Sequence, residues 1–442
     1  MSFKNLVFPD SINIMADTSL FIFITICGAI VGWSIIRLER IYQFPFFMAS
    51  VFLSFILPQA IAIIENPGIG VTDIAIERML IYTSLCVAMC WIGYQSSPNP
   101  KWLNKLNVDV DENKLFKAGI VLLIIGQICI FALSRITIQT SAAAGGNWTG
   151  PATILGFFAG TLRIALPLFL IRALKKPSFL NIFLTTISAL PMVQAVIFSG
   201  RRQTTVALFI TVGLCFFIVK KYTPPRLLLV LLVPIAAYLI PTLGALRGRF
   251  WELAFAGRWD EIQMASERGF DRVLEGNILE LRNATLVMDY ATQLDYYGYG
   301  RQLWNRFIFQ YVPGQLVGND LKENLQFNLN FDLVSFFGYQ TSTGTTLTGI
   351  GDSFMDFGFF GCLFFALMAY LYKTLWTSTV DSKSIISTLL YISIIDSAMV
   401  GVTHGIGRFM NEFIFRAGIM FLVTYYCKSS DTKQIQLSST YE

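Results

Sequence analysis

Long apolar runs constrain this chain more than any other feature of its sequence. Each run is about twenty residues long, the length that a helix needs to cross roughly 30 Å of hydrocarbon. We distinguish about eleven of them, near residues 19–36, 44–64, 75–95, 116–134, 153–173, 178–198, 203–219, 227–245, 354–372, 385–402 and 407–427. Hydrophobic residues make up 54% of the 442 residues and charged residues 14%, a balance that excludes an ordinary soluble protein. The sequence therefore predicts an all-α polytopic integral membrane protein, and no cleavable signal peptide is evident in its first run.

Basic residues in alternate connectors predict the orientation of the chain, because short connectors rich in lysine and arginine stay in the cytoplasm. Such connectors follow every second run and carry Arg37, Arg40, Lys101, Lys105, Lys114, Arg172, Lys175, Lys176, Lys220, Lys221, Arg226, Lys373, Lys383, Lys428 and Lys433. The amino terminus is then outside and the carboxyl terminus is cytoplasmic. This topology divides the chain into transmembrane helices 1–8 (residues 1–245), a large extracytoplasmic loop with short helices (246–353), and transmembrane helices 9–11 with a cytoplasmic tail (354–442).

The cysteines and the basic residues exclude other classes of protein. The seven cysteines lie inside the apolar runs or at their edges, so we expect no disulfide framework. Cys86 and Cys90 are one helical turn apart, the spacing of half a metal site, but the single histidine is far away in the sequence, which favours simple packing. Nucleic-acid binding is not supported, because the basic residues fall into two other groups. One group consists of the orientation signals in the cytoplasmic connectors, and the other consists of the arginines on the predicted outer side.

Two arginine pairs lie in connectors on the predicted outer side, where orientation signals are not needed. Arg201 and Arg202 stand in the turn FSGRRQ, and Arg247 and Arg249 stand in the corner LRGRF. A guanidinium binds phosphate through two parallel hydrogen bonds, whereas lysine offers a point charge. These arginines either reach lipid head groups and acidic residues of the loop, or form a site for a phosphate-bearing ligand. Their clustering favours the phosphate site.

The large outer loop has the composition of a folded segment. Residues 277–297 carry apolar residues at near-helical spacing, which predicts one or two helices that could lie on the membrane surface. At the end of this segment and just after it, Tyr297, Tyr299 and Trp304 lie close together in the sequence, among arginines. Aromatic rings pack on the apolar faces of sugars, so this stretch is a candidate glycan surface. An aromatic belt at the membrane interface would give the same composition.

Two acidic residues follow in a segment rich in glycine and small polar residues, TSTGTTLTGIGDSFMDFGFFG (341–361). Asp352 and Asp356 are one helical turn apart, so their side chains can share a helix face. The glycines allow either a close approach of the backbone to a ligand or tight helix packing.

The last apolar run contains ionisable residues at four-residue spacing: His404, Arg408, Glu412 and Arg416. This spacing places them along one helical face that descends into the bilayer. Ionisable groups inside hydrocarbon cost several kcal/mol each, so they face a polar cavity or one another. Arg163 and Asp396, in other runs, add to the charges that need partners. Two interpretations stay open, a self-neutralising ladder of ion pairs and a shared polar cavity that opens outward.

Together these features resemble the bacterial O-antigen and capsule repeat-unit polymerases, the Wzy-like family. The likeness rests on a polytopic chain with one long outer loop in its second half, on the GRR turn, and on the sequence GDSFMDFGFFG from Gly351 to Gly361. It covers most of the chain in architecture, through short motifs. The fold that it implies is similar to the membrane-embedded GT-C enzymes and to the O-antigen ligases.

The resemblance implies an enzyme, a metal-independent glycosyltransferase of the bacterial inner membrane. Such an enzyme joins oligosaccharide repeats, linked to undecaprenyl diphosphate, on the outer face of that membrane, and needs no nucleotide sugar or other cofactor. Arg201 and Arg202 match the family's outer arginines expected to hold the diphosphate, and Arg247 and Arg249 match more loosely. Membrane lipid, a chain-length regulator and a flippase are the further partner candidates.

Further roles are assigned from residue chemistry rather than from family motifs. Arg408 is a further candidate ligand for the diphosphate, because fixed positive charge stabilises a leaving phosphate. The candidate bases for the incoming hydroxyl are His404, Asp352, Asp356 and Glu412. Two other functions share this chemistry, an O-antigen-ligase-type transferase and a flippase or transporter of lipid-linked oligosaccharide. Transporters commonly contain two repeated halves, which this sequence lacks.

Overall fold

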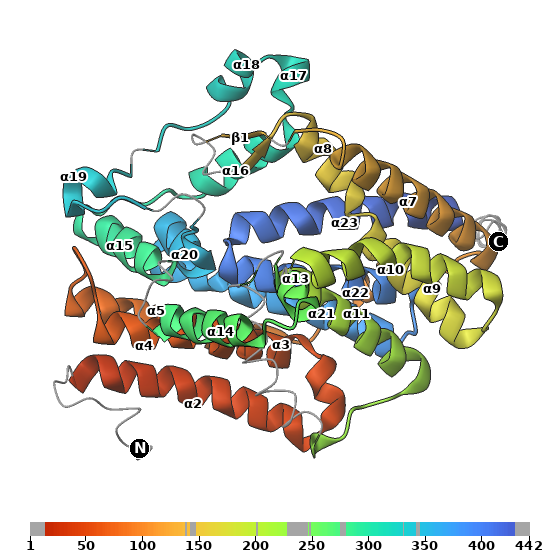
Figure 1. Cartoon of the computed structure of the whole chain (residues 1–442), viewed down its shortest axis with the longest axis horizontal. Coiled ribbons are helices and arrows are strands. Elements are labelled where there is room, and N and C mark those ends of the chain that lie inside the picture. The colour runs from red at the N-terminus through yellow and green to blue at the C-terminus, as the bar shows by residue number, and fades with distance from the viewer. Residues whose placement is uncertain are drawn as a thin grey trace, which may run out of the picture.

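The computed structural model describes residues 14–137, 139–141, 147–199, 202–227, 246, 249–274, 280–329, 331–341 and 345–428. This part of the chain is almost entirely helical, and most of its long helices run side by side as a bundle (Figure 1). Within it, nine helical stretches are long and apolar enough to cross a membrane: Met15–Ile36, Phe44–Glu65, Asp73–Gln95, Glu112–Leu133, Pro151–Lys175, Phe179–Phe198, Gln203–Lys220, Thr348–Val380 and Ile385–Thr403. The protein is therefore a helical, multi-pass membrane protein.

The elements before the large loop are α2 (Ile14–Ile36), η1 (Leu38–Tyr42), α3 (Phe44–Val51), η2 (Phe52–Ile56), α4 (Leu57–Glu65), α5 (Asp73–Gln95), α6 (Pro100–Leu106), α7 (Glu112–Leu133), β1 (Gln139–Ser141), β2 (Asn147–Thr149), α8 (Pro151–Ala159), α9 (Leu162–Lys175), α10 (Phe179–Ser199) and α11 (Arg202–Lys220). The two short strands form an antiparallel pair. Polar side chains cap the N-termini of two of these helices. Thr72 accepts a hydrogen bond from the backbone N–H of Ala75 at the start of α5. Asp111 accepts from the backbone N–H groups of Asn113 and Lys114 at the start of α7.

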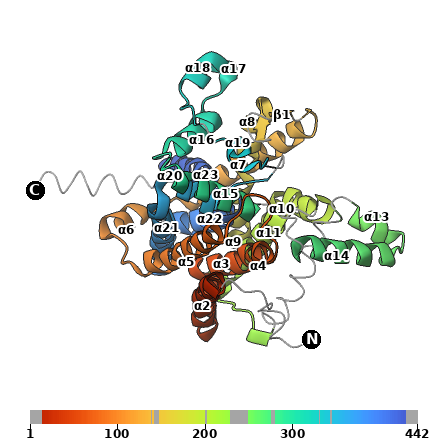
Figure 2. The ribbon, with the colours of Figure 1, turned by 90° about the vertical axis from the view of Figure 1, so that its left-hand side faces the viewer.

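The later elements are α13 (Phe250–Phe255), α14 (Trp259–Leu274), α15 (Glu280–Gln293), α16 (Arg301–Tyr311), α17 (Gly314–Val317), α18 (Asn319–Asn324), α19 (Leu333–Phe337), α20 (Thr348–Phe357), η3 (Gly358–Cys362), α21 (Leu363–Val380), α22 (Ile385–Thr403) and α23 (Ile406–Cys427). Viewed along the bundle, α13 and α14 lie at one side of it and α17 and α18 project above it (Figure 2). Gly358 ends α20 with a φ of +56°, a conformation that strains other residues.

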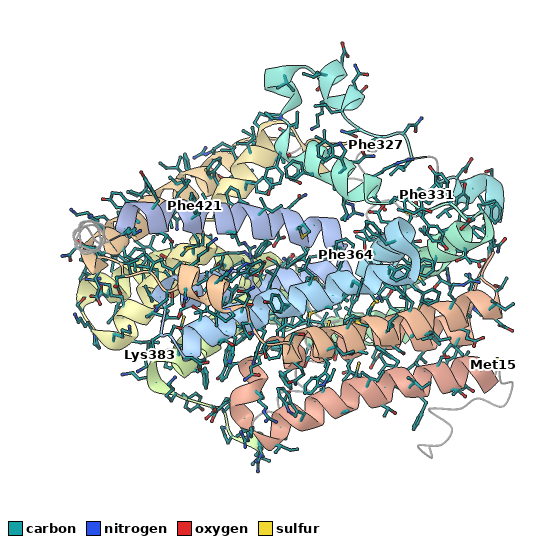
Figure 3. The ribbon with its side chains drawn as sticks, turned by 180° about the vertical axis from the view of Figure 1, so that it is seen from behind. Met15, Phe327, Phe331, Phe364, Lys383 and Phe421 are labelled. Carbon is teal, nitrogen blue, oxygen red and sulfur yellow. The ribbon has the colours of Figure 1, made fainter. Side chains whose placement is uncertain are left out.

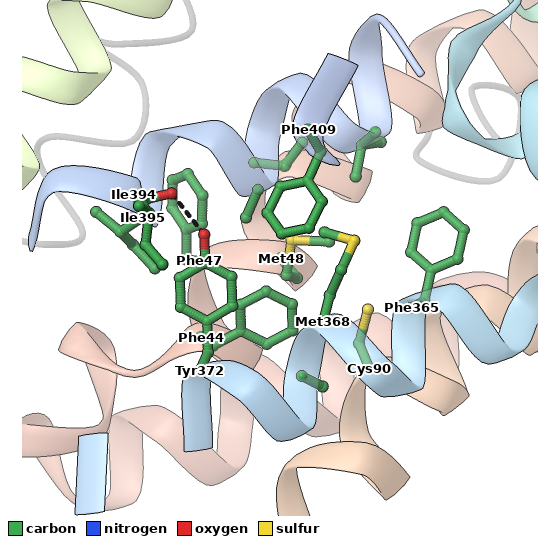
Figure 4. Close-up of a cluster of buried hydrophobic side chains, with 14 of the residues drawn as sticks. Phe44, Phe47, Met48, Cys90, Phe365, Met368, Tyr372, Ile394, Ile395 and Phe409 are labelled. Carbon is green, nitrogen blue, oxygen red and sulfur yellow. Dashed lines mark hydrogen bonds between the residues drawn. The ribbon is translucent and has the colours of Figure 1, made fainter. Parts of the chain in front are cut away.

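The core lies where α3, α5, α21, α22 and α23 meet, and it is rich in aromatic and sulfur-containing side chains (Figure 4). Phe44 stacks on Tyr372 with ring centroids 4.7 Å apart, and the Tyr372 hydroxyl donates to the backbone oxygen of Ile394. Buried tyrosines need such a partner for their hydroxyl. All seven cysteines are buried and free, and Cys86 and Cys90 pack in this core.

The observed helices agree with most of the predicted runs and correct some of their ends. The run 227–245 lies almost wholly outside the described residues. The run 407–427 is α23, which is long enough to span a bilayer but is not among the nine stretches named above. The predicted start of the run 354–372 is wrong, because α20 already begins at Thr348. The predicted loop boundary at residue 353 therefore falls inside a helix. Apolar composition could not reveal that the small polar residues before it are helical.

The connectors between the helices gather at two ends of the bundle. At one end, which we call the basic end, Arg226 donates to the backbone oxygen of Ile36, and Ser384 donates to that of Leu106. Lys383 marks this end in Figure 3, and Met15 and Phe331 lie toward the other. At that other end, which we call the loop end, Arg282 donates to the backbone oxygen of Asn66.

The helix predicted within residues 277–297 is confirmed as α15, but the idea that it lies on the membrane surface is wrong. Nearly every residue from Leu281 to Ala291 is buried, because α15 packs between α5, α20 and α19. A buried ion pair ties it to α5: Arg78 Nη1 lies 2.8 Å from Asp289 Oδ1, and the Asp289 side chain is 3% exposed. The loop is therefore docked into the bundle at α15.

Candidate functional site

Several of the sequence-predicted acidic and basic residues lie near the loop end, where α16 lies across the start of α23 and beside α20 (Figure 1). Two sets of contacts make up this region. One is a group of charged side chains between α9, α22 and α23, which we call the charged cluster: Arg163, Asp396, Arg408, Glu412 and Arg416. The other joins α16 to α20 and to the turn between α22 and α23.

Arg416 is the centre of the charged cluster. Its side chain is 6% exposed, and its two terminal nitrogens lie 2.9 Å from Asp396 Oδ1 and 2.8 Å from Glu412 Oε2. Asp396 also contacts Arg163, which comes from α9. The Ser397 hydroxyl donates to Glu412 at 2.7 Å. The buried charges therefore face one another, as a self-neutralising ladder requires, and charges in hydrocarbon are tolerated in this arrangement.

The ladder does not neutralise itself completely, however. Three guanidinium groups face two carboxylates, so the charged cluster carries one excess positive charge at neutral pH. The excess lies toward Arg408, because its Nε is 4.0 Å from Glu412 Oε1 and its side chain is 48% exposed. Arg408 is in the first turn of α23, at the loop end. An anionic group at this edge would complete the charge balance.

A second ion pair, between Arg306 of α16 and Asp352 of α20, closes over this region. The two side chains meet at 2.7 Å, and Asp352 is 1% exposed. Gly405 and Gly407 make room for it, since a Cβ at Gly405 would lie 2.6 Å from Arg306 Nη1 and a Cβ at Gly407 would overlap the Arg306 side chain. Asp352 also accepts a hydrogen bond of 3.3 Å from the backbone N–H of Gly407. Arg306 thus joins α16, α20 and the start of α23.

Asp356 also faces α16, as its spacing from Asp352 predicts. Its carboxylate accepts hydrogen bonds from the backbone N–H groups of Gln302 and Leu303, at 3.4 and 3.3 Å, in the first turn of α16. A negative charge there satisfies unpaired N–H groups and complements the helix dipole. In this arrangement both aspartates hold α16 in place, which speaks against either as a free general base.

His404 differs from its prediction. It does not share a helical face with Arg408, Glu412 and Arg416, because α22 ends at Thr403 and α23 begins only at Ile406. Gly405 turns the chain between them with a φ of +113°. His404 Nδ1 lies 2.6 Å from the Thr403 hydroxyl, and its backbone oxygen faces Arg306. Burial and the nearby charge of Arg408 lower the pKa of His404 to about 4.

This lowered pKa predicts how stability depends on pH. The unfolded chain takes up a proton at His404 near pH 6.5, while the folded chain resists protonation until about pH 4. The contribution of His404 to stability is therefore complete above pH 6.5 and is lost as the pH falls toward 4. We expect the His404→Gln variant to lose less stability than the wild type between these pH values. Thermal unfolding in detergent across this range measures the difference, and parallel curves for the two proteins would contradict the assignment.

The comparisons with known proteins add nothing to this geometry. No protein-family model, curated protein or solved structure matches the chain. Among the described residues, no group of three or more His, Cys, Asp or Glu side chains could hold a metal ion.

The predicted glycan-binding residues divide into two environments. Tyr299 is 69% exposed and Trp304 is 44% exposed, both at the start of α16. The Trp304 indole donates to the backbone oxygen of Leu325, which fixes the plane of its ring. Tyr297 is half-buried and packs on Gly358 and Phe354. Tyr299 and Trp304 are therefore available to a ligand, and Tyr297 supports the fold.

The predicted outer arginines are only partly described. Arg201 and Arg247 lie outside the described residues, and Arg202 begins α11 with its side chain outside the description. Arg249 is exposed at the start of α13. The Trp251 indole of α13 donates to the backbone oxygen of Ile197, just before the FSGRRQ turn. Helix α13, which follows the LRGRF corner, is thus held against the end of α10, which precedes the FSGRRQ turn.

Arg306 is the residue that the sequence analysis missed. It is one of two arginines that lie among the aromatic residues of the large loop, and nothing in the local sequence connects it with Asp352. The pattern HGIG at 404–407 was an available signal, because two glycines in one turn mark a close approach by another chain segment. Sequence spacing could not show which segment approaches.

Proposed function

We propose that this protein is a polysaccharide polymerase, a glycosyltransferase that joins oligosaccharide repeats linked to undecaprenyl diphosphate. The observation that carries the proposal is the excess positive charge of the charged cluster, which ends at the half-exposed Arg408. Tyr299 and Trp304 present exposed aromatic rings at the same end of the bundle. A lipid diphosphate joined to a sugar chain needs both kinds of surface.

In this proposal the chain lies in a bacterial inner membrane with its amino terminus outside, and it crosses the membrane eleven times in a GT-C-like arrangement. Residues 246–353 form the extracytoplasmic loop. The loop end then faces outward, where lipid-linked repeats are joined. The regular alternation of basic connectors supports this orientation.

The reaction would transfer the growing chain onto the incoming repeat. The hydroxyl of that repeat attacks the anomeric carbon, the bond from this carbon to the diphosphate oxygen breaks, and the hydroxyl proton leaves to a base or to the departing diphosphate. Arg201 and Arg202, with Arg247 or Arg249 and Arg408, would stabilise the charge on the departing diphosphate. Asp352, Asp356 and Glu412 are held in ion pairs or at a helix start, so we rank the arginines above any base.

The length distribution of surface polysaccharide tests this function. A strain lacking the protein should make a single attached repeat, and wild type should restore the ladder of bands on a gel. Neither Arg201→Ala nor Arg408→Ala should restore it, although both should be present in the membrane. Arg258→Ala is the control, because Arg258 is an exposed arginine of the large loop (246–353). Among the described residues it pairs only with the neighbouring Glu261.

Other results of the same experiment would replace the proposal. An unchanged ladder in the strain lacking the protein would exclude polymerisation. Unattached lipid-linked polymer would indicate an O-antigen-ligase-type transferase, and accumulation of repeats on the cytoplasmic face would indicate a flippase.

A further inference from the structure

A second region of interest lies at the basic end, away from the charged cluster's exposed edge. A cavity of about 350 Å³ opens there between the short helix α6 and the helices α21, α22 and α23. In the view along the bundle, α6 lies outside α21, on the side opposite α13 and α14 (Figure 2). This volume is in the range of cavities that bind small molecules.

The walls of this cavity are mainly apolar. Leu371 and Leu375 come from α21, Leu390 comes from α22, and Phe413 comes from α23. Phe413 follows Glu412 in sequence, so the cavity reaches to the turn of α23 that carries part of the charged cluster. Water gains few hydrogen bonds in an apolar cavity, and an apolar chain fills it more favourably.

The rim of the cavity has a different character. Among the described residues, Lys105 is the one charged residue that lines it, and it is exposed. Lys101 precedes it by one turn on α6 and is exposed as well. Trp102, between them, is 46% exposed, and its ring centroid lies 6.1 Å from that of Tyr370. Tryptophan and lysine at a helix end are typical of the boundary between hydrocarbon and head groups.

We propose that this cavity binds a membrane phospholipid with an anionic head group. One acyl chain lies between α21, α22 and α23, and the phosphate lies against the ammonium group of Lys105, with Lys101 nearby. The combination of an apolar cavity with a basic rim carries this inference, because a neutral apolar ligand would not need the lysines. The positive rim also suits the leaflet that attracts basic segments to anionic lipid. The inference does not rest on the proposed polymerase function.

Native mass spectrometry of the full-length protein in detergent tests the site. Wild type is titrated with phosphatidylglycerol and, separately, with phosphatidylcholine of the same acyl chains. We expect wild type to retain phosphatidylglycerol preferentially. Lys105→Ala should lower that preference about fivefold, the effect of one lysine near an anionic head group. Lys175→Ala is the matched control, an exposed lysine at the end of α9 that does not line the cavity.

A second variant separates the cavity from its rim. Leu371→Trp places a larger side chain in the wall, so it should reduce the binding of both lipids while leaving the elution volume in size-exclusion chromatography unchanged. Equal lipid retention by wild type and both variants would overturn the proposal. A Leu371→Trp variant that changed the oligomeric mass instead would assign the cavity to contact between two copies of the chain, and would overturn it as well.

Discussion

Replacement of Asp396 by asparagine is expected to lower the free energy of unfolding by about 3–5 kcal/mol, the usual cost of removing one partner of a buried ion pair. The Asp396 side chain is 4% exposed and contacts both Arg163 and Arg416. Without its charge, three arginines face only Glu412, and the excess positive charge of the cluster rises from one to two. Asp396 uses one carboxylate oxygen for each arginine, whereas an amide has a single accepting oxygen and would turn an NH2 donor toward one of the guanidinium groups.

Removal of Arg163 should lower the free energy of unfolding less than removal of the Asp396 carboxylate does. Arg163→Met leaves two arginines and two carboxylates, so the cluster becomes neutral and Asp396 keeps Arg416 at 2.9 Å. Unfolding in mixed micelles measures the free energies of both variants. Asp381→Asn is the matched control, because Asp381 is exposed at the end of α21. An Arg163→Met variant less stable than Asp396→Asn would show that the excess charge is not where we place it.

The same cluster illustrates what the sequence could predict of this site. Residues 408, 412 and 416 recur every four positions, so their contact follows from helix geometry alone. The partners from other helices do not follow, since Asp396 meets Arg416 only because α22 and α23 pack together. The sequence analysis recognised Arg163 and Asp396 as charges that need partners but had no means of pairing them.

Helices were predicted more securely than their ends. An apolar run long enough to cross the bilayer has few alternatives to a helix, because each backbone polar group needs a partner inside hydrocarbon. Interruptions leave weaker signals. Gly160 and Thr161 separate α8 from α9 within one predicted run, where the Thr161 hydroxyl donates to the backbone oxygen of Leu122. That contact depends on the position of α7, which the sequence of α8 and α9 does not contain.

The prediction that α15 could lie on the membrane surface was wrong for a related reason. Apolar residues at helical spacing are equally typical of a helix on a membrane surface and of a helix packed against others. The decisive residues are polar: Asn283 and Asp289 are buried, and each has a hydrogen-bond partner outside α15. Only the fold supplies these partners, so the composition of α15 alone could not exclude the membrane surface.

The second large effect is expected at Arg306. Arg306→Met leaves the Asp352 carboxylate 1% exposed and without its cation, whereas Asp352→Asn leaves a guanidinium that is 29% exposed and can turn toward water. We therefore expect Arg306→Met to lower the free energy of unfolding by roughly 3 kcal/mol, and Asp352→Asn to lower it less. The same loss should loosen α16, so a protease should cut the loop after Tyr311 faster in Arg306→Met than in wild type.

Two further variants keep this prediction specific. Arg301→Met is the matched control on the same helix, since Arg301 is exposed and lies 5.7 Å from the Phe327 ring rather than in a buried ion pair. Gly407→Ala should reproduce the faster cleavage without removing any charge, because its Cβ would overlap the Arg306 side chain and displace it from Asp352. If Arg306→Met and Arg301→Met were cleaved at the same rate, the pair would not be what holds α16. If Gly407→Ala behaved like wild type, the close approach of Arg306 to the α23 turn would be wrong.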